Sequence, residues 1–147
     1  MKRETTKLVM LVEDNPNDEA LAVRALKKVV DGPIVVARDG AEALDLLFLP
    51  ATEAPRTPDM VLLDLHLPKI GGQEVLRRIR SDPRTRLLPV VILTSSGDPG
   101  DLDHCYDLGA NRCAIKPVDS EAYVELVRQI AAYWLFFEEA APRSDEP

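Results

Sequence analysis

Side chains that can bind cations or take part in phosphoryl transfer stand directly after several aliphatic runs of this chain. They comprise three carboxylates, one hydroxyl and one amine: Glu13 and Asp14, Asp64, Thr94, and Lys116. A carboxylate held between a divalent cation and an ammonium group is suited to act as a nucleophile on phosphorus, because the cations neutralise charge on the transferring group. Asp64, at the end of "MVLLD", is the candidate nucleophile. Thr94 could then donate a hydrogen bond to a phosphoryl oxygen.

The carboxylates also indicate a cation site. Crowded carboxylates raise one another's pKa unless an ammonium group or a metal ion compensates them. Mg²⁺ typically takes one or two protein carboxylates and keeps several waters, which fits Asp14 and Asp64 with the backbone carbonyl of His66. The imidazole of His66 is not an expected ligand, because a hard cation prefers oxygen. Taken alone, each carboxylate could instead be a helix cap or a solvated loop residue, and Asp14 could merely cap the first helix.

Five aliphatic or β-branched runs predict the strands that position these side chains: residues 7–12, 34–37, 60–63, 90–93 and 113–115. Several are apolar throughout, which is typical of strands covered on both faces. Helical patterns follow the runs, with Asn15–Pro16 and Asp39 as expected helix starts. This alternation predicts a doubly wound α/β fold, with helices on both faces of a five-stranded parallel sheet. In the strand order 2-1-3-4-5, ligands bind between strands 1 and 3.

Length and composition limit the function classes. The 147 residues fit one domain, with 138–147 expected to be a flexible tail and no room for an output domain. No apolar run approaches the roughly 18 residues of a membrane span, so a cytoplasmic location is expected. A net charge of −7 and the lack of a basic stripe argue against nucleic-acid binding. Cys105 and Cys113 form no metal-ligand pattern, and reduced thiols are expected.

Four motifs occur in a fixed order along the chain: "VEDN", "LLDLHLPKIGG", "ILTSSG" and "IKPV". Together they resemble response-regulator receiver domains, over residues 6–137, and the resemblance implies the flavodoxin-like strand order given above. It also implies site roles: Glu13 and Asp14 as an acidic Mg²⁺ pair, Asp64 as phosphoacceptor, Thr94 as switch hydroxyl, and Lys116 as phosphate contact before a cis peptide at Pro117. The family takes its phosphoryl group from a histidine kinase, so a signalling protein with slow autodephosphorylation at most, and no enzyme, is expected.

One position departs from the family pattern. Receiver domains commonly carry Tyr or Phe three residues before the lysine, a ring that moves inward when the switch hydroxyl engages phosphate. This chain has Cys113 there. A thiol cannot reproduce that movement, so the usual output face is expected to signal differently or to change little.

The last expected helix, from Ser120 to about Phe137, ends in the aromatic residues Tyr133, Trp134, Phe136 and Phe137. A helix end cannot bury all four. Packing against the core accounts for Trp134 and Phe137, and the exposed remainder predicts a homodimer or a partner-docking surface through this helix. The "AYW" ending resembles single-domain response regulators that are paired with phytochrome-type photoreceptor kinases.

Three alternatives compete with this hypothesis. A haloacid-dehalogenase-type phosphatase needs a second aspartate two residues after the first, where this chain has His66. A flavodoxin-like electron carrier needs a Ser-, Thr- and Gly-rich phosphate loop, whereas the two carboxylates of "EDNPND" would repel a flavin phosphate. A degenerate receiver would bind partners without phosphorylation, and the presence of Asp14, Asp64, Thr94 and Lys116 argues against it.

Overall fold

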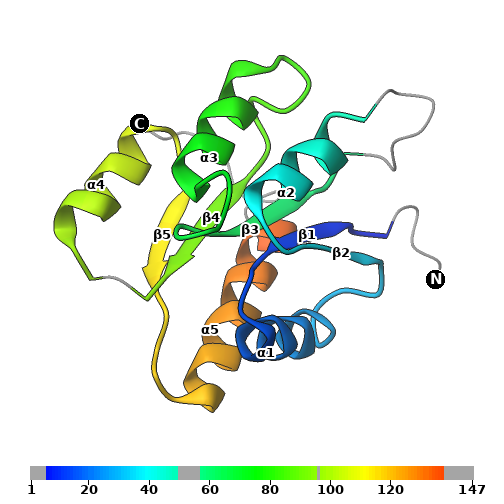
Figure 1. The fold of residues 1–147 in the computed structure, drawn as a ribbon. Helices are drawn as coiled ribbons and strands as arrows, with labels where there is room; N and C mark the ends of the chain where they lie inside the picture. Colours follow the sequence, from blue (N-terminus) through cyan, green and yellow to red (C-terminus); the bar gives the residue numbers. More distant parts are fainter. Residues whose placement is uncertain (1–5, 50–56, 96, 138–147) are drawn as a thin grey trace.

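Five strands alternate with five helices in the computed structural model, which describes residues 6–49, 57–95 and 97–137 (Figure 1). The strands are β1 (Val9–Val12), β2 (Ile34–Ala37), β3 (Met60–Asp64), β4 (Val90–Thr94) and β5 (Arg112–Ile115). The helices are α1 (Pro16–Leu26), α2 (Gly40–Leu47), α3 (Gly72–Ser81), α4 (Pro99–Asp107) and α5 (Ser120–Ala132), and a π-helical turn, η1 (Tyr133–Phe137), continues α5. None of the described helices is long and apolar enough to cross a membrane.

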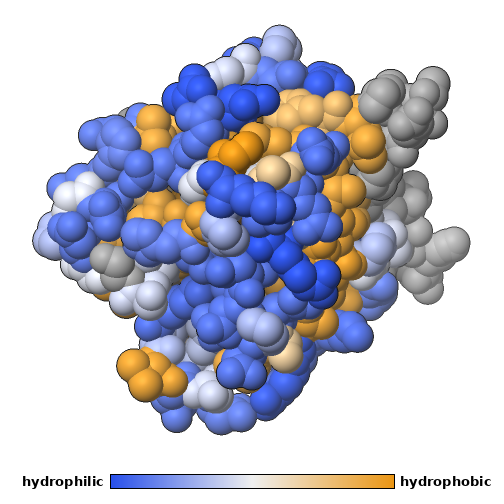
Figure 2. All heavy atoms as spheres, in the orientation of Figure 1, coloured by the Kyte–Doolittle hydropathy of each residue, from blue (hydrophilic) through white to orange (hydrophobic). Residues whose placement is uncertain are grey.

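The sheet has the order β2-β1-β3-β4-β5 with all neighbouring strands parallel, as predicted. Alternate residues of the central strands face two separate hydrophobic clusters. Leu11 and Leu62 pack with α1 and α5, whereas Val12 and Leu63 pack with α2, α3 and α4. Figure 1 shows the same division of the helices between the two faces. Burial on both faces explains why β1 is apolar throughout and why β3 is apolar up to its last residue. The molecular surface seen in Figure 2 is mostly hydrophilic, with apolar side chains gathered in patches.

Two helices begin at the residues that the sequence indicates. Oδ1 of Asn15 accepts a hydrogen bond from the backbone N–H of Asp18 at 3.0 Å, and Pro16 is the first residue of α1. Oδ1 of Asp39 accepts from the backbone N–H of Glu42 at 2.8 Å, which caps α2. Each cap satisfies a backbone donor that has no partner within its helix. The α1 cap lies next to the end of β1, so it also fixes the loop that carries Glu13 and Asp14.

The start of α3 packs very closely against the end of β3. A Cβ atom on Gly72 would lie 2.4 Å from the backbone oxygen of Asp64 and 2.9 Å from Cα of Leu65. The N–H of Gly72 donates to the backbone oxygen of Leu65 at 3.0 Å, which holds the two segments together. Glycine is therefore required here, because any side chain would push α3 away from the strand end that carries Asp64.

The end of the last helix differs from the expected regular helix. In the π-helical turn, Leu135 lies five residues after Ile130, and the two side chains are both 1% exposed. Trp134 packs against the same hydrophobic cluster and stays partly exposed, so its predicted core contact is confirmed in part. The wider spacing of a π-helix turns Leu135 inward, which regular helical spacing did not predict. The side chain of Phe137 lies outside the described residues.

Candidate phosphoacceptor site

The predicted site residues gather at the carboxyl edge of the sheet. Glu13 and Asp14 follow β1, Asp64 and Thr94 are the last residues of β3 and β4, and Lys116 follows β5. The backbone N–H of Lys116 donates to the backbone oxygen of Thr94 at 2.7 Å, which carries the pairing of β4 and β5 up to the site. In a parallel sheet of this order, the edge between β1 and β3 is where ligands bind.

The ammonium group of Lys116 joins three carboxylates from three different elements. Its Nζ lies 2.9 Å from Oε1 of Glu13, 2.9 Å from Oδ2 of Asp18 and 3.2 Å from Oδ2 of Asp64. The side chains of Lys116 and Asp64 are each 9% exposed, and that of Glu13 is 2% exposed. Buried charges need oppositely charged partners nearby, and here the ammonium group and the carboxylates compensate one another. Lys116 is therefore the compensating cation that the sequence predicts.

Asp18 is the site residue that the sequence reasoning missed. Its place in the first turn of α1 suits the helix dipole, and this local explanation is sufficient without a tertiary role. In the folded chain it contacts Lys116, which is 98 residues away in sequence. The useful signal was its spacing, because a residue one turn into the helix after an acidic pair returns to the same side of the strand end.

The carboxylates form a group that can hold a divalent cation. One oxygen from each of Glu13, Asp14 and Asp64 lies within 4.8 Å of the other two. Asp14 is exposed, whereas Glu13 and Asp64 are buried, so the group opens to solvent on the side of Asp14. An all-oxygen group with access to water fits Mg²⁺ or Mn²⁺, which complete their shells with solvent. Counting Asp18, the site holds four carboxylates and one ammonium group, so a divalent cation would offset the excess negative charge.

His66 contacts the site through its backbone. Its N–H donates to Oδ1 of Asp64 at 3.1 Å, which fixes the orientation of that carboxylate. The imidazole is 60% exposed, and its Nε2 lies 4.0 Å from Oδ2 of Asp101. A surface histidine thus occupies the position where the phosphatase alternative needs a second aspartate. The structure gives no support to an acid–base role two residues after Asp64.

Burial and neighbouring groups together set the pKa values of Glu13 and Lys116. The pKa of Glu13 is raised to about 7: burial is the largest cause, the hydrogen bond from Lys116 opposes it, and the negative charge of Asp64 adds to the rise. For Lys116, burial lowers the pKa, but the hydrogen bonds to Asp18 and Glu13 and the charge of Asp64 outweigh it. The pKa of Lys116 is therefore above its ordinary value, and the lysine stays charged at neutral pH.

The raised pKa of Glu13 predicts that the metal-free protein loses stability as pH rises. Between the ordinary value of 4.5 and the folded value of about 7, the folded state holds a proton that the unfolded state has released. The stabilisation is thus complete below pH 4.5 and is lost as pH passes through about 7. We expect this group to lower the free energy of unfolding by about 3 kcal/mol at most. Urea unfolding in a chelating buffer, at several values from about pH 5 to about pH 8, measures the change.

Glu13→Gln is expected to remove this slope, and the exposed Glu121→Gln serves as the matched control. An unchanged slope in Glu13→Gln would show that another group produces it. Adding Mg²⁺ to the wild type at the upper end of the range should restore stability, because the ion binds the ionised carboxylates.

The peptide bond before Pro117 is trans, which corrects the expectation of a cis bond. The trans isomer is favoured by about 0.5–1 kcal/mol at proline unless the surroundings impose the other one. Here Val118 is fully exposed, so the chain leaves the site directly into solvent after Pro117.

Thr94 lies where the sequence predicts it, fully buried at the end of β4 beside the strand of Asp64.

Cys113 does not join the carboxylate group. It lies opposite Ile92 on the edge strand β5, and its N–H donates to the hydroxyl of Tyr106 on α4 at 3.0 Å. Its Sγ lies 3.8 Å from the backbone oxygen of Leu102, also on α4. Both cysteines are free thiols, as expected, and burial raises the pKa of Cys113 to about 12. The aromatic group that touches this position therefore comes from α4 and not from β5.

The aromatic residues at the end of the last helix lie at the opposite edge of the sheet. Nζ of Lys7, just before β1, lies 5.6 Å from the centre of the Phe136 ring. The rings of Tyr133 and Trp134 contact each other edge to face, with centroids 5.0 Å apart. These residues are therefore remote from Asp64, and any effect of phosphorylation on them has to pass through the fold.

Comparison with known proteins supports the same interpretation. The family model of the response regulator receiver domain matches residues 9–128. FilR2 of Methanothrix harundinacea, named a probable methanogenesis regulatory protein, is 40% identical over 136 residues, which cover 92% of this chain and 88% of that protein. The response regulator Rcp1 of Synechocystis sp. is 35% identical over 132 residues, covering 88% and 89%.

Solved structures agree in fold. The phosphorylated cyanobacterial phytochrome response regulator RcpA superposes with a TM-score of 0.85 at 38% identity, covering 90% of this chain and 96% of that one. The Mn²⁺-bound form of Rcp1 gives a TM-score of 0.82 at 34% identity, covering 88% and 95%. Because the family model spans most of the sequence and these structures share its fold over nearly their whole length, the chain belongs to the response regulator receiver domain family.

Proposed function

We propose that this protein accepts a phosphoryl group from a histidine kinase onto Asp64 and thereby relays a signal. The observation that carries the proposal is the position of Asp64, whose Oδ2 contacts Lys116 and whose carboxylate lies within ligand distance of Glu13 and Asp14. A carboxylate in such a group is both activated and accessible to a cation. A phosphatase would need an acid–base residue two residues later, and a surface histidine lies there. This favours an acceptor that keeps its phosphoryl group.

The transfer forms one bond and breaks another. A carboxylate oxygen of Asp64 forms the new bond to phosphorus while the bond from phosphorus to the phosphohistidine nitrogen of the kinase breaks, and its electron pair returns to that nitrogen. His66 holds the carboxylate through its N–H. The ammonium group of Lys116 would contact one phosphoryl oxygen in addition to its present carboxylate partners. The hydroxyl of Thr94 would donate a hydrogen bond to a second phosphoryl oxygen. Thr94 and Lys116 already share a backbone hydrogen bond, so the two groups would respond together.

Asp14 and Asp64, with the backbone carbonyl of His66, would hold Mg²⁺ in this proposal, and Glu13 lies beside them in the same acidic group. When bound, the ion supplies positive charge that offsets the negative charge of the transferring group. Asp14 and Asp64 are the direct carboxylate ligands in this assignment. Glu13 is shielded from solvent, and its hydrogen bonds to Lys116 and to the N–H of Asn15 leave it to position the other groups.

The proposed kinase is of the phytochrome photoreceptor type. The support is the likeness to RcpA, whose solved structure is described as a phytochrome response regulator and covers 90% of this chain. FilR2 has the higher identity, and its name refers to methanogenesis, so this assignment depends on the structural likeness and not on sequence identity.

The proposed output surface is the end of the last helix, where two copies of the chain would meet. Tyr133 is 47% exposed and Phe136 is 39% exposed, which is unusual for large aromatic residues on neighbouring turns. Aromatic side chains of this kind are enriched in protein interfaces. The exposed rings therefore support a homodimer or a docked partner at this edge.

The test is phosphoryl uptake by the purified protein. With Mg²⁺ and a small acyl phosphate as donor, we expect intact mass to increase by one phosphoryl group and oligomer size to change in the same samples. A chelator should prevent the mass gain, because the carboxylates alone repel the anionic donor. No mass gain with Mg²⁺ present would contradict the proposed acceptor function. A mass gain without any change in size would contradict the proposed dimer surface only.

A further inference from the structure

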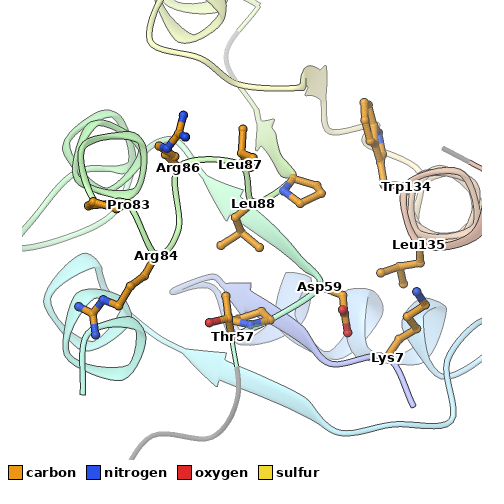
Figure 3. A pocket seen from close by; sticks show the side chains of 12 residues that line it. Lys7, Thr57, Asp59, Pro83, Arg84, Arg86, Leu87, Leu88, Trp134 and Leu135 are labelled. Atoms are coloured by element: carbon orange, nitrogen blue, oxygen red, sulfur yellow. The ribbon is translucent and has the colours of Figure 1, made fainter. Parts of the chain in front are cut away.

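A pocket of about 440 Å³ opens at the edge of the sheet opposite Asp64 (Figure 3). It is bounded by the loop between α3 and β4, the beginnings of β1 and β3, and the π-helical turn η1. Its apolar surface comes from Leu87, Leu88, Trp134, Leu135 and three prolines. Leu87 is 76% exposed, so part of this apolar surface faces water. We call it the basal pocket.

The basal pocket carries positive charge on both of its sides. Figure 3 shows Lys7 beside Leu135 on one side and the guanidinium groups of Arg84 and Arg86 across the pocket from it. Arg84 forms an ion pair with Asp82 at 3.3 Å. Arg86 is exposed, and its guanidinium has no ion pair with any residue in the described part of the chain. Asp59 also lines the pocket, beside Lys7, so the lining has three cationic side chains and one carboxylate. In a chain of net charge −7, this is a site of net positive charge with an apolar interior.

Residues 138–147 of the same chain have the complementary charge. The segment reads "EEAAPRSDEP", with four acidic residues and one arginine. The acidic residues form two pairs near its two ends, Glu138 with Glu139 and Asp145 with Glu146, separated by two alanines, a proline, an arginine and a serine. Cations at both sides of a pocket fit a segment that is acidic at both ends and less polar between.

We propose that residues 138–147 occupy the basal pocket of their own chain, with the first acidic pair toward Lys7 and the second toward Arg84 and Arg86. The segment follows Phe137 directly, and Trp134 and Leu135 of the same turn line the pocket. Ten residues reach about 33–36 Å when extended, which is ample to cross a pocket of this size. This interaction is independent of phosphoryl transfer at Asp64.

Attachment favours this segment over an acidic segment of a separate protein. A group tethered by a few residues has an effective concentration on the order of millimolar, whereas a separate partner has to bind from solution. Charge pairs at the rim of a pocket are individually weak and are screened by salt. The proposed contact is therefore expected to open at high ionic strength.

Trp134 provides the measurement, because it is the only tryptophan in the chain and it lines the pocket. We compare the full-length wild type with a variant in which Glu138, Glu139, Asp145 and Glu146 become Gln or Asn, and with Arg86→Glu. Both changes should shift the Trp134 emission to longer wavelength, and salt should produce the same shift in the wild type only. Asp103→Asn with Asp107→Asn, and Arg112→Glu, change exposed charges elsewhere and serve as matched controls.

A charge exchange adds specificity to the test. Asp145→Arg with Glu146→Arg, introduced into the chain that carries Arg84→Glu and Arg86→Glu, should return the emission toward the wild-type value. Circular dichroism confirms that each variant is folded. Emission that is the same in wild type and both variants would overturn the proposal. All emission is compared at a concentration at which sedimentation shows a monomer, because a dimer through Tyr133 and Phe136 would also change the surroundings of Trp134. A difference between wild type and variants that is absent in the monomer and appears only in the dimer would also overturn the proposal, because the segment would then be exchanged between two copies.

Discussion

Asp64→Asn is expected to abolish phosphoryl uptake while leaving the fold intact. The amide has the size of the carboxylate but lacks the negative oxygen that attacks phosphorus. Lys116 keeps Glu13 and Asp18 as partners at 2.9 Å each, so its charge stays compensated. Since the charge of Asp64 contributes to the raised pKa of Glu13, removing it should leave the metal-free protein at least as stable at neutral pH.

Intact mass after incubation with Mg²⁺ and an acyl phosphate measures the uptake, and urea unfolding measures the stability. Asp103→Asn on the exposed side of α4 removes the same charge and is expected to behave like the wild type in both measurements. A phosphoryl mass gain in Asp64→Asn equal to that of the wild type would place the acceptor on another residue, with Asp14 the next candidate.

Lys116→Met is expected to cause the largest loss of stability of any single change at the site. The methionine fills a similar volume but leaves Glu13, Asp18 and Asp64 without their shared cation. Removing one partner of a buried ion pair typically costs about 3–5 kcal/mol, because a charge remains buried without compensation. The side chains of Lys116 and Asp64 are only 9% exposed, so water can replace little of the lost interaction.

The sign of the pH and metal effects identifies this cause. Acid should partly restore the stability of Lys116→Met, since protonation neutralises the crowded carboxylates, and Mg²⁺ should restore it by supplying positive charge. Lys27→Met, at an exposed position, is the control and should change stability little. A loss of stability in Lys116→Met that neither acid nor Mg²⁺ reduces would point to a packing defect and not to electrostatics.

Local patterns in the sequence were sufficient to predict the fold. The continuous apolar runs at β1, β3 and β4 reflect burial on both faces, and Asn15 and Asp39 cap their helices through bonds to residues three positions away. Such features depend on neighbours in sequence, which is why they can be read without a structure. The candidate site followed from the fold, because parallel strands bring their last residues to one edge.

Features that depend on packing between distant segments were not predictable in this way. The sequence predicted a core contact for Trp134 and exposed rings beside it, and Tyr133 and Phe136 are exposed. Only the π-helical turn, however, placed Leu135 in the core. The resemblance implied a cis bond before Pro117, whereas this chain has the trans isomer and continues into an exposed loop. The basal pocket combines four separate segments, so no single stretch of sequence indicated it.

Asp64 shows where the two sources of information meet. The sequence by itself determined that a carboxylate ends a buried strand. It also determined that an acidic pair, a threonine and a lysine stand at the ends of other strands. Only the tertiary structure decided how that carboxylate is tolerated. Lys116 is shared with Asp18, and Glu13 is buried deeply enough for its pKa to rise to about 7, while Asp14 stays in solvent. These differences arise because burial and charge act through space, between side chains that are as many as 103 residues apart in the chain.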